Sequence, residues 1–389
     1  MIRDRDITVL GAGIAGLAVA RALALRGARV TVLEQSAEIR EVGAGLQVSP
    51  NGARVLAALG LADAFAARSQ VAEAVELRDG ETGGQVVRIP LAGRPGADFR
   101  MVHRADLIDV LEAGARAAGA EIRLLQKVAE VRLGDHPPRL VMSTGAEQEV
   151  GLLVGADGLH SRLRAALTGT VAPFFTHQVA WRATIAAGPG IRPVPQVFMG
   201  QGRHLVTYPL RGGTLRNIVA VEERRVWAEE SWSLTDDPLA LRIAFEDFAP
   251  EVRGWLDQIE RPNLWGLFRH PVAHRWHAGA AVILGDAAHP TLPFLAQGAN
   301  LALEDAWVLA DCLARLPAEA ALAAYQSRRE SRARRTVEAA NANARNYHLS
   351  GLRRDLAHLG LRALGRLSPD TLRRRFDWLY DHDVTRPGA

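Results

Sequence analysis

The chain has 389 residues, 48% of them hydrophobic and 23% charged, which suits two or three globular domains and argues against a disordered chain. Its net charge is +4, but the basic residues are spread along the sequence except near the C-terminus, so we expect no nucleic-acid partner. No apolar run approaches the ~20 residues of a membrane span. Cys312 is the only cysteine, which predicts a reduced, cytoplasmic protein without a metal site.

Residues 7–34 predict a strand, a glycine-rich turn, a helix and a second strand, in this order. The strands are the apolar runs 7–10 and 30–33, and an alanine-rich segment between them reads as the helix. A secretory signal peptide is the alternative interpretation of this apolar start. Acidic residues near the N-terminus and arginines inside the apolar stretch argue against it.

The glycines of this unit form the pattern G-x-G-x-x-G, and an acid ends the second strand. Gly11 permits the tight turn, Gly13 lets the backbone approach a pyrophosphate, and Gly16 allows the helix to pack closely on the strand. The helix N-terminus offers unpaired N–H groups to phosphates. Glu34 is placed to accept hydrogen bonds from a ribose. Taken alone, the unit predicts a dinucleotide site, most readily for NAD.

The next segment mixes helices with short strands. Ser49 and Pro50 mark the start of a helix, and the turn Thr82-Gly83-Gly84 predicts a hairpin within residues 71–90. We expect a helix at 103–118 and strands at 121–125, 129–133, 140–143 and 150–156.

The pattern then changes to an alternation of period two between residues 178 and 223. It predicts antiparallel strands, with a hairpin turn at residues 211–214. Beyond this segment we expect mixed helices to about 260, a buried strand at 280–284, a helix at 298–316, and arginine-rich helices at the C-terminus.

Two further motifs follow buried strands. LVGADGLHSR contains Asp157 and VILGDAAHP contains Asp286, and each aspartate ends its strand, where ligand crevices open in α/β sheets. An Asp-Gly pair after a strand is, by itself, often only a turn. The chain has no second complete G-x-G-x-x-G, so we predict a single dinucleotide domain.

These three motifs in this order resemble the class A flavoprotein monooxygenases, aromatic hydroxylases built like p-hydroxybenzoate hydroxylase. The resemblance covers nearly the whole chain. EIREVGAGLQVSPN, VAWRATI, HLVTYPLRGG and FDWLYDHD are most similar to the salicylate hydroxylase and 3-hydroxybenzoate 6-hydroxylase branch. It implies an α/β fold with three parts: a discontinuous Rossmann-like FAD-binding domain of the GR2 type (1–70, 100–175 and 265–320), an inserted, mostly antiparallel substrate domain (71–99 and 176–264), and a C-terminal helical region (321–389).

The resemblance implies a tight, non-covalent FAD and a transiently bound NAD(P)H. It assigns Asp286 to the ribityl chain, the Asp157 motif to FAD and nicotinamide contacts, and Arg104 to the flavin or the ribityl chain. The helix that starts at Gly298 would direct its free N–H groups at the flavin ring. The predicted cofactor-binding residues are Gly11, Gly13, Ile14, Ala15, Gly16, Glu34, Arg40, Val48, Arg104, Val128, Asp157, Asp286, Gly298, Ala299 and Asn300.

The implied reaction is hydroxylation of a small, phenolic acid-like aromatic by NAD(P)H and O2 through a flavin C4a-hydroperoxide. A quinone, an N-heteroaromatic or a polycyclic precursor is the alternative substrate. A flavin-binding regulatory protein with a decayed site is a third reading. The sequence leaves open the substrate, the position hydroxylated, loss of carbon dioxide, NADH versus NADPH, and monomer versus homodimer.

Hydroxylation needs an electron-rich ring, so a base that removes the phenolic proton is expected, and histidine suits that task. His204 and Tyr208 face the same side of the predicted strand 203–208. By resemblance they roof the substrate, with His204 as the base or phenol partner and Tyr208 as an orienting group. Ordinary packing in a sheet is the alternative role for both.

Four more residues are candidates near the substrate. Gln297 is a possible substrate contact, and Pro293 would shape the pocket near the flavin. Arg182 is a candidate for binding a carboxylate, but its neighbour Trp181 points to the opposite face of the strand, so only one of the two can face the substrate. His289 is favoured as a structural residue.

Overall fold

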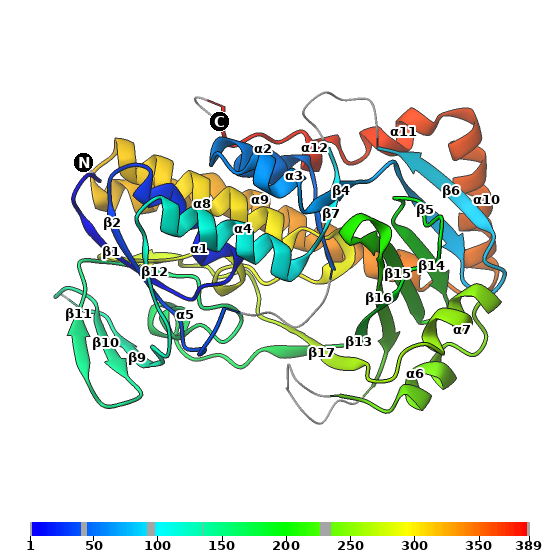
Figure 1. Ribbon diagram of the computed structural model, residues 1–389, viewed down its shortest axis with the longest axis horizontal. Coiled ribbons are helices and arrows are strands. Elements are labelled where there is room, and N and C mark those ends of the chain that lie inside the picture. The colour runs from blue at the N-terminus through cyan, green and yellow to red at the C-terminus, as the bar shows by residue number, and fades with distance from the viewer. Residues whose placement is uncertain (1, 40–44, 92–97, 135, 226–234, 387–389) are drawn as a thin grey trace.

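The computed structural model of the chain describes residues 2–39, 45–91, 98–134, 136–225 and 235–386. Two large β-sheets lie at opposite ends of the molecule (Figure 1). The first has six strands, parallel except at the β18–β19 edge. Its strands in spatial order are β18 (His277–Ala278), β19 (Ala281–Ile283), β12 (Leu152–Gly155), β1 (Asp6–Leu10), β2 (Arg29–Leu33) and β8 (Glu121–Arg123).

Helices flank this parallel sheet because its central strands are apolar along most of their length. Helix α1 (Ile14–Ala24) directly follows β1 and contacts both α4 (Arg104–Ala117) and α8 (Gly298–Arg315). Helix α5 (Arg162–Thr168) contacts β12 and β19, and α9 (Ala318–Tyr347) packs along α8 (Figure 1). The predicted strand–helix–strand unit at residues 7–34 is confirmed.

The second sheet has seven strands and is antiparallel except for the β14–β5 pair. The predicted hairpin turn at Thr82-Gly83-Gly84 joins two of its strands. Strand β17 continues to Arg269, so this sheet extends past the predicted domain boundary at residue 265. In spatial order the strands are β17 (Asn263–Arg269), β13 (Phe174–Ala186), β16 (Leu215–Glu223), β15 (Arg203–Leu210), β14 (Gln196–Gly200), β5 (Ala74–Asp79) and β6 (Gln85–Pro90).

Two small sheets and several helices complete the described part of the chain. The expected turn at 211–214 is a short 3-10 helix, η1 (Arg211–Gly213), and sequence reasoning missed β11. The small sheets are β3 (Gly45–Val48), β7 (Arg100–His103) and β4 (Ser69–Val71), and β11 (Glu147–Glu149), β10 (Arg139–Met142) and β9 (Val128–Arg132). The remaining helices are α2 (Pro50–Ala58), α3 (Ala62–Ala66), α6 (Pro238–Ala244), α7 (Pro250–Leu256), α10 (Gly351–Leu367), α11 (Pro369–Arg374), α12 (Asp377–Tyr380), η2 (Gly285–Ala287) and η3 (Pro293–Leu295).

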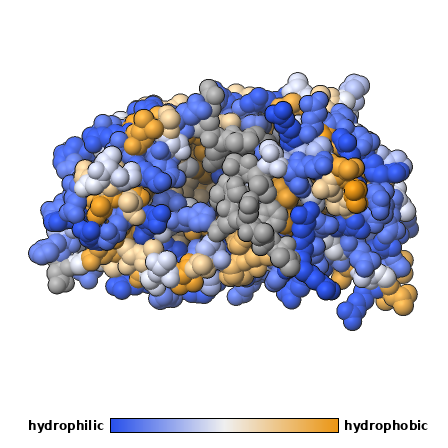
Figure 2. Space-filling model, turned by 90° about the horizontal axis from the view of Figure 1, so that it is seen from below, coloured by the Kyte–Doolittle hydropathy of each residue, from blue (hydrophilic) through white to orange (hydrophobic). Residues whose placement is uncertain are grey.

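The buried apolar residues form separate cores. The largest surrounds the six-stranded sheet, and a second lies between the seven-stranded sheet and helices α6 and α7. The face in Figure 2 is mainly hydrophilic, with hydrophobic residues in small groups between. Among the described helices, none combines the length and apolar character of a membrane span. The two largest cores belong to the two large sheets, while the predicted domain boundaries stay a prediction.

Candidate functional site

A cavity of about 900 Å³ lies beyond the carboxyl ends of β1 and β12, against one face of the seven-stranded sheet. Its lining comes from both large sheets, from α8 and α9, and from the C-terminal segment. The structure therefore brings together residues far apart in the sequence. The predicted residues that line it are Gly11, Gly13, Ile14, Ala15, Glu34, Arg104, Val128, Asp157, Arg182, His204, Tyr208, Asp286, Pro293, Gly298 and Ala299.

The three glycines of the first motif have different surroundings. Gly11 has a φ of +94°, and a Cβ atom on it would lie 2.6 Å from the carbonyl oxygen of Ala156. A Cβ on Gly16 would overlap the carbonyl oxygen of Gly11. Gly13 has nothing within 4 Å of such an atom and lines the cavity. Gly11 and Gly16 thus allow close packing, and Gly13 leaves open space where a diphosphate would sit beside the start of α1.

Glu34 is held in place at the end of β2. Its carboxylate accepts hydrogen bonds from the backbone N–H of Ala12 at 2.8 Å and of Ser36 at 2.9 Å. The side chain also lines the cavity. Since a carboxylate can accept about four hydrogen bonds, these two leave capacity for the hydroxyl groups of a ribose.

Asp157 lines the cavity and also stabilises the start of α5. Its carboxylate accepts hydrogen bonds from the hydroxyl of Ser161 at 2.5 Å and from the backbone N–H of Arg162 at 2.7 Å. These bonds order the start of α5. Burial raises the pKa of Asp157, although the hydrogen bonds oppose that shift.

Asp286 opens onto the cavity from the turn that follows β19. Its side chain is exposed to the cavity, and desolvation by the surrounding protein raises its pKa, while His289 and Arg104 oppose the shift. A carboxyl group open to a deep cavity is suited to accept hydrogen bonds from hydroxyl groups of a bound ligand.

A buried ionic network, which sequence reasoning missed, fixes the turn that carries Asp286. Asp305 of α8 accepts hydrogen bonds from the backbone N–H of Gly285 at 3.0 Å, from His289 at 2.6 Å and from Arg329 at 2.7 Å. His289 does not line the cavity, and this position agrees with its expected structural role. Acidic residues of α8 pair with arginines of α9 in this network. The sequence does not indicate these pairs, because they form only when the two helices pack together.

Four predicted cofactor or substrate residues do not reach the cavity lining. The amide of Gln297 donates to Ser49 Oγ at 2.9 Å and accepts from Asn51 at 3.1 Å. Asn300 accepts from the Ser49 backbone N–H at 3.0 Å. Side-chain amides this deeply buried need partners, and the start of α2 supplies them. Val48 and Gly16 are likewise buried beside the cavity, so none of these four residues lines the cavity, and their contact with a ligand stays a prediction. Arg40 lies outside the described residues.

His204 stands at an aromatic end of the cavity. Its ring centroid lies 5.3 Å from that of Phe294 and 5.2 Å from that of Tyr347, and its Nδ1 lies 2.7 Å from Nε2 of His348. Burial, and secondarily His348, lowers the pKa of His204 well below its ordinary value. The ring is therefore neutral near pH 7 and able to accept a proton.

Tyr208 and Arg182 lie on the same face of the sheet. The Tyr208 ring packs against Gly45, where a Cβ atom would come within 2.8 Å of its hydroxyl oxygen. Trp181 points into the core and donates to Asp236 at 2.8 Å, so Arg182 is the neighbour that faces the cavity.

The side chain of Arg182 is half-buried, and its guanidinium has no anionic partner among the described residues. It stacks 4.3 Å above the Trp265 ring, and its Nε has no hydrogen-bond acceptor in the described part of the chain. Burial, with a smaller contribution from Arg104, lowers the pKa of Arg182 to about 10, so it stays charged at neutral pH. An unpaired buried charge is unfavourable, which makes this cation suited to an anionic ligand.

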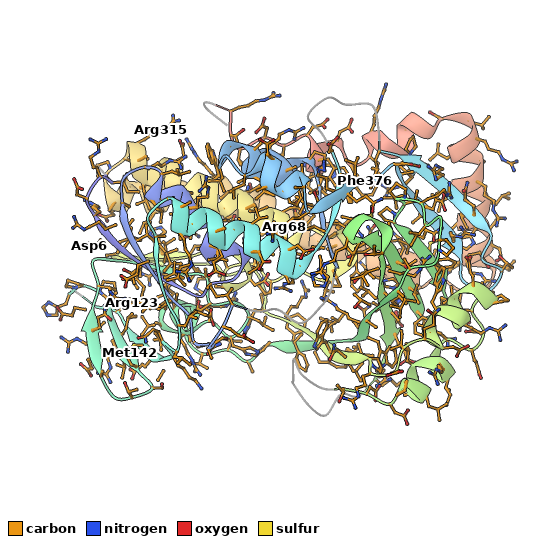
Figure 3. The ribbon with its side chains drawn as sticks, in the orientation of Figure 1. Asp6, Arg68, Arg123, Met142, Arg315 and Phe376 are labelled. Atoms are coloured by element: carbon orange, nitrogen blue, oxygen red, sulfur yellow. The ribbon has the colours of Figure 1, made fainter. Side chains whose placement is uncertain are left out.

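The C-terminal part of the chain contributes aromatic lining that sequence reasoning did not single out. Tyr347 is the last residue of α9, and Phe376 and Tyr380 come from the segment around α12. Phe376, labelled in Figure 3, lies far from Asp6 at the start of β1. The aromatic run FDWLYDHD was the available signal, but only the tertiary structure shows that it reaches the cavity.

The sequence matches the FAD binding domain family over residues 4–340. The 3-amino-4-hydroxybenzoate 2-monooxygenase of Streptomyces cremeus is 38% identical over 357 residues, covering 89% of each chain. The 3-hydroxybenzoate 6-hydroxylase of Klebsiella oxytoca is 31% identical, covering 96% of this chain and 95% of that one.

Solved structures agree with this relationship. Klebsiella pneumoniae HpxO complexed with FAD and uric acid superposes with a TM-score of 0.84 at 25% identity, covering 97% of this chain and 96% of that one. A salicylate hydroxylase substrate complex superposes with a TM-score of 0.82 at 24% identity, covering 98% of this chain and 96% of that one. The predicted α/β flavoprotein fold and the FAD cofactor are thereby confirmed, and the chain belongs to the FAD-dependent aromatic monooxygenase family.

Proposed function

We propose that this monooxygenase hydroxylates a phenolic carboxylic acid and uses NAD(P)H and O2 as co-substrates. The observation that carries the proposal is a half-buried cation without an anionic partner in the described part of the chain, Arg182, and a neutral base, His204, on one face of the same sheet at one cavity. FAD, when bound along the glycine motif and Asp286, supplies the redox chemistry that activates oxygen.

The strand register sets the distance between the two groups. Arg182 pairs with Val219 of β16, and Val219 pairs with Val206 of β15, two residues from His204. Two strand spacings separate β13 from β15 by about 10 Å. An aromatic acid bound between them would direct its carboxylate to Arg182 and its hydroxyl to His204. Bidentate pairing with a carboxylate is a geometry that the guanidinium fork favours.

In this arrangement His204 accepts the phenolic proton, because its lowered pKa leaves it neutral, and Tyr208 orients the ring from the same strand. Tyr347, Phe294 and Tyr380 exclude water around the reacting carbon. Relatives named for hydroxybenzoates support the choice of a phenolic acid. A quinone or a polycyclic substrate would have no use for the cation at Arg182, so we rank these substrates second.

The test is a screen of phenolic acids, N-heteroaromatics and quinone precursors with the FAD-loaded protein, following NAD(P)H oxidation, product mass and peroxide release. We expect 3-hydroxybenzoate or 3-amino-4-hydroxybenzoate to stimulate oxidation and to gain one oxygen atom. Hydroxylation of uncharged substrates alone would contradict the assignment to phenolic acids. For the base, His204→Ala should lose most coupled hydroxylation at neutral pH, and an unchanged yield of product would contradict its role.

A further inference from the structure

Three titratable side chains lead in single file from the cavity to the surface. His204 is 1% exposed, and its Nδ1 lies 2.7 Å from Nε2 of His348. Nδ1 of His348 lies 2.7 Å from Oε1 of Glu223, whose side chain is 52% exposed. Because Nδ1 of His204 is turned to His348, its Nε2 is the nitrogen available to the cavity. This row of three side chains thus begins at the proposed phenol and ends in water.

The three members come from different elements and are held there by the backbone. His204 belongs to β15, Glu223 ends β16, and His348 directly follows α9. The N–H of Gly202 donates to the carbonyl of His348 at 3.4 Å, and the N–H of Glu223 donates to the carbonyl of Gly202 at 2.9 Å. The end of α9 is therefore joined to the β15–β16 pair at the point where the side chains meet.

We propose that His204, His348 and Glu223 form a proton relay that carries the phenolic proton out of the closed cavity. The relay rests on the proposed function, because the phenol of the substrate is its proton donor. His348 and Glu223 do not touch the substrate, so they act through His204 and are not catalytic residues themselves.

The transfers balance at each nitrogen. The phenol O–H bond breaks as an Nε2–H bond forms on His204, and the Nδ1 proton of His204 passes to Nε2 of His348. The Nδ1 proton of His348 passes to the Glu223 carboxylate, which releases it to water. Each ring gains one proton and loses one, so neither ends as a cation. Running the sequence backwards returns a proton to the cavity and restores both tautomers.

Burial gives the relay a physical purpose. Desolvation lowers the pKa of His204 and of His348, and Glu223 opposes the shift only at His348. A proton resting on His204 would therefore be unfavourable, and passing the proton outward avoids that state. Among the described residues, Tyr347 is the other titratable group whose ring contacts His204, and burial raises its pKa to about 12, so it keeps its own proton.

The alternative is that His348 and Glu223 only orient the His204 ring. Glu223→Gln separates the two roles, because the glutamine oxygen can still accept the hydrogen bond from His348 but takes up no proton. Its side chain is largely exposed, so the fold should tolerate the change. Glu222→Gln is the matched control, since the neighbouring residue carries the same charge and pairs instead with Arg224.

The experiment mixes the FAD-loaded enzyme rapidly with 3-hydroxybenzoate or 3-amino-4-hydroxybenzoate and follows phenolate absorbance. We expect Glu223→Gln and His348→Gln to slow phenolate formation at least tenfold with unchanged FAD content, and Glu222→Gln to match the wild type. Free imidazole should restore part of the rate in His348→Gly.

Phenolate formation by Glu223→Gln at the wild-type rate would overturn the relay while leaving the proposed function intact. A slow His348→Gln beside a normal Glu223→Gln would also overturn it, because that pattern shows orientation alone. If the wild type forms no phenolate with any phenol, the proposed function fails and the relay fails with it.

Discussion

The Arg182 guanidinium is the group on which substrate binding depends most directly in the proposed reaction. Arg182→Met should raise KM for a phenolic acid by about 10- to 100-fold, the effect of losing a hydrogen bond to a charged group. Steady-state kinetics with equal FAD content will measure it. Arg216→Met is the control, because Arg216 also stacks on a tryptophan, 4.0 Å from the Trp255 ring, but does not line the cavity. Equal KM values for both variants would exclude Arg182 as the carboxylate site.

Gly13 and Gly16 give opposite predictions for the same substitution. Gly13→Ala should change the free energy of unfolding of the apoprotein by less than about 0.5 kcal/mol, as is usual at sites free of packing conflicts. It should weaken FAD binding, because the new methyl group occupies the open space beside the cavity. Gly16→Ala should destabilise the apoprotein by about 1–3 kcal/mol, as overpacking does, because its methyl overlaps the Gly11 carbonyl. Thermal unfolding of both apoproteins and FAD titration will distinguish the two; equal stability losses would contradict the assignment.

At the scale of elements, α8 and α9 are joined by Glu304, which pairs with Arg329 at 2.6 Å and with Arg332 at 2.7 Å. Glu304→Gln should lower the free energy of unfolding by about 3–5 kcal/mol, because it leaves the buried Arg332 without its counter-charge and removes one of the two carboxylates that pair with Arg329. Asp311→Asn on the same helix breaks pairs with two exposed arginines, Arg315 and Arg328, and should lower the free energy of unfolding by less than about 1 kcal/mol. Denaturant unfolding of both variants measures the difference, and similar losses would contradict a special role for the buried pair.

The two buried carboxylates of α8, Glu304 and Asp305, predict a dependence of the free energy of unfolding on pH. Arg329 and Arg332 hold the pKa of Glu304 to about 2, and His289 with Arg329 holds that of Asp305 to about 2, against ordinary values of 4.5 and 3.8, although burial alone would raise both. Because the folded values lie below the unfolded ones, the stabilisation is complete above about pH 4.5 and is lost as the pH falls towards 2. Unfolding midpoints between pH 7 and pH 3 should therefore fall less steeply in Glu304→Gln than in the wild type. Parallel slopes would contradict this origin of acid sensitivity.

At the scale of the whole molecule, the C-terminal segment lines one part of the cavity. Arg332 donates to the carbonyl of Leu379 at 2.9 Å, and Arg54 donates to that of Tyr380 at 2.7 Å. The Tyr380 ring lines the cavity and packs 5.9 Å from Phe99. Tyr380→Ala should admit water and raise the share of NAD(P)H oxidation that ends as hydrogen peroxide several-fold, whereas Tyr380→Phe keeps the ring and should stay near the wild type. Unchanged peroxide in Tyr380→Ala would show that the segment does not seal the site.

Local features of the sequence predicted which residues meet where the parallel strands end. The glycine motif, the acid at the end of β2 and the aspartates after β12 and β19 each follow a strand, and the carboxyl ends of parallel strands meet at one edge. Strand alternation also placed His204 and Tyr208 on one face, because side chains repeat every two residues. Their functional roles stay predictions.

The substrate half depended on partners far away in the chain. Gln297 and Asn300 read as ligand contacts, yet the start of α2, about 250 residues earlier, occupies their amides. Only the packing of the seven-stranded sheet decided that Arg182 rather than Trp181 faces the cavity.

By itself, then, the sequence determined the strand–helix–strand unit, the FAD cofactor and the family, because backbone turns and strand ends are specified by neighbouring residues. The tertiary structure alone decided the lining of the cavity by the C-terminal segment, the ionic network under Asp286, and the contact of His204 with His348. Those contacts join elements separated by long stretches of chain. Their geometry follows from how the two sheets and the C-terminal helices pack, which no local pattern encodes.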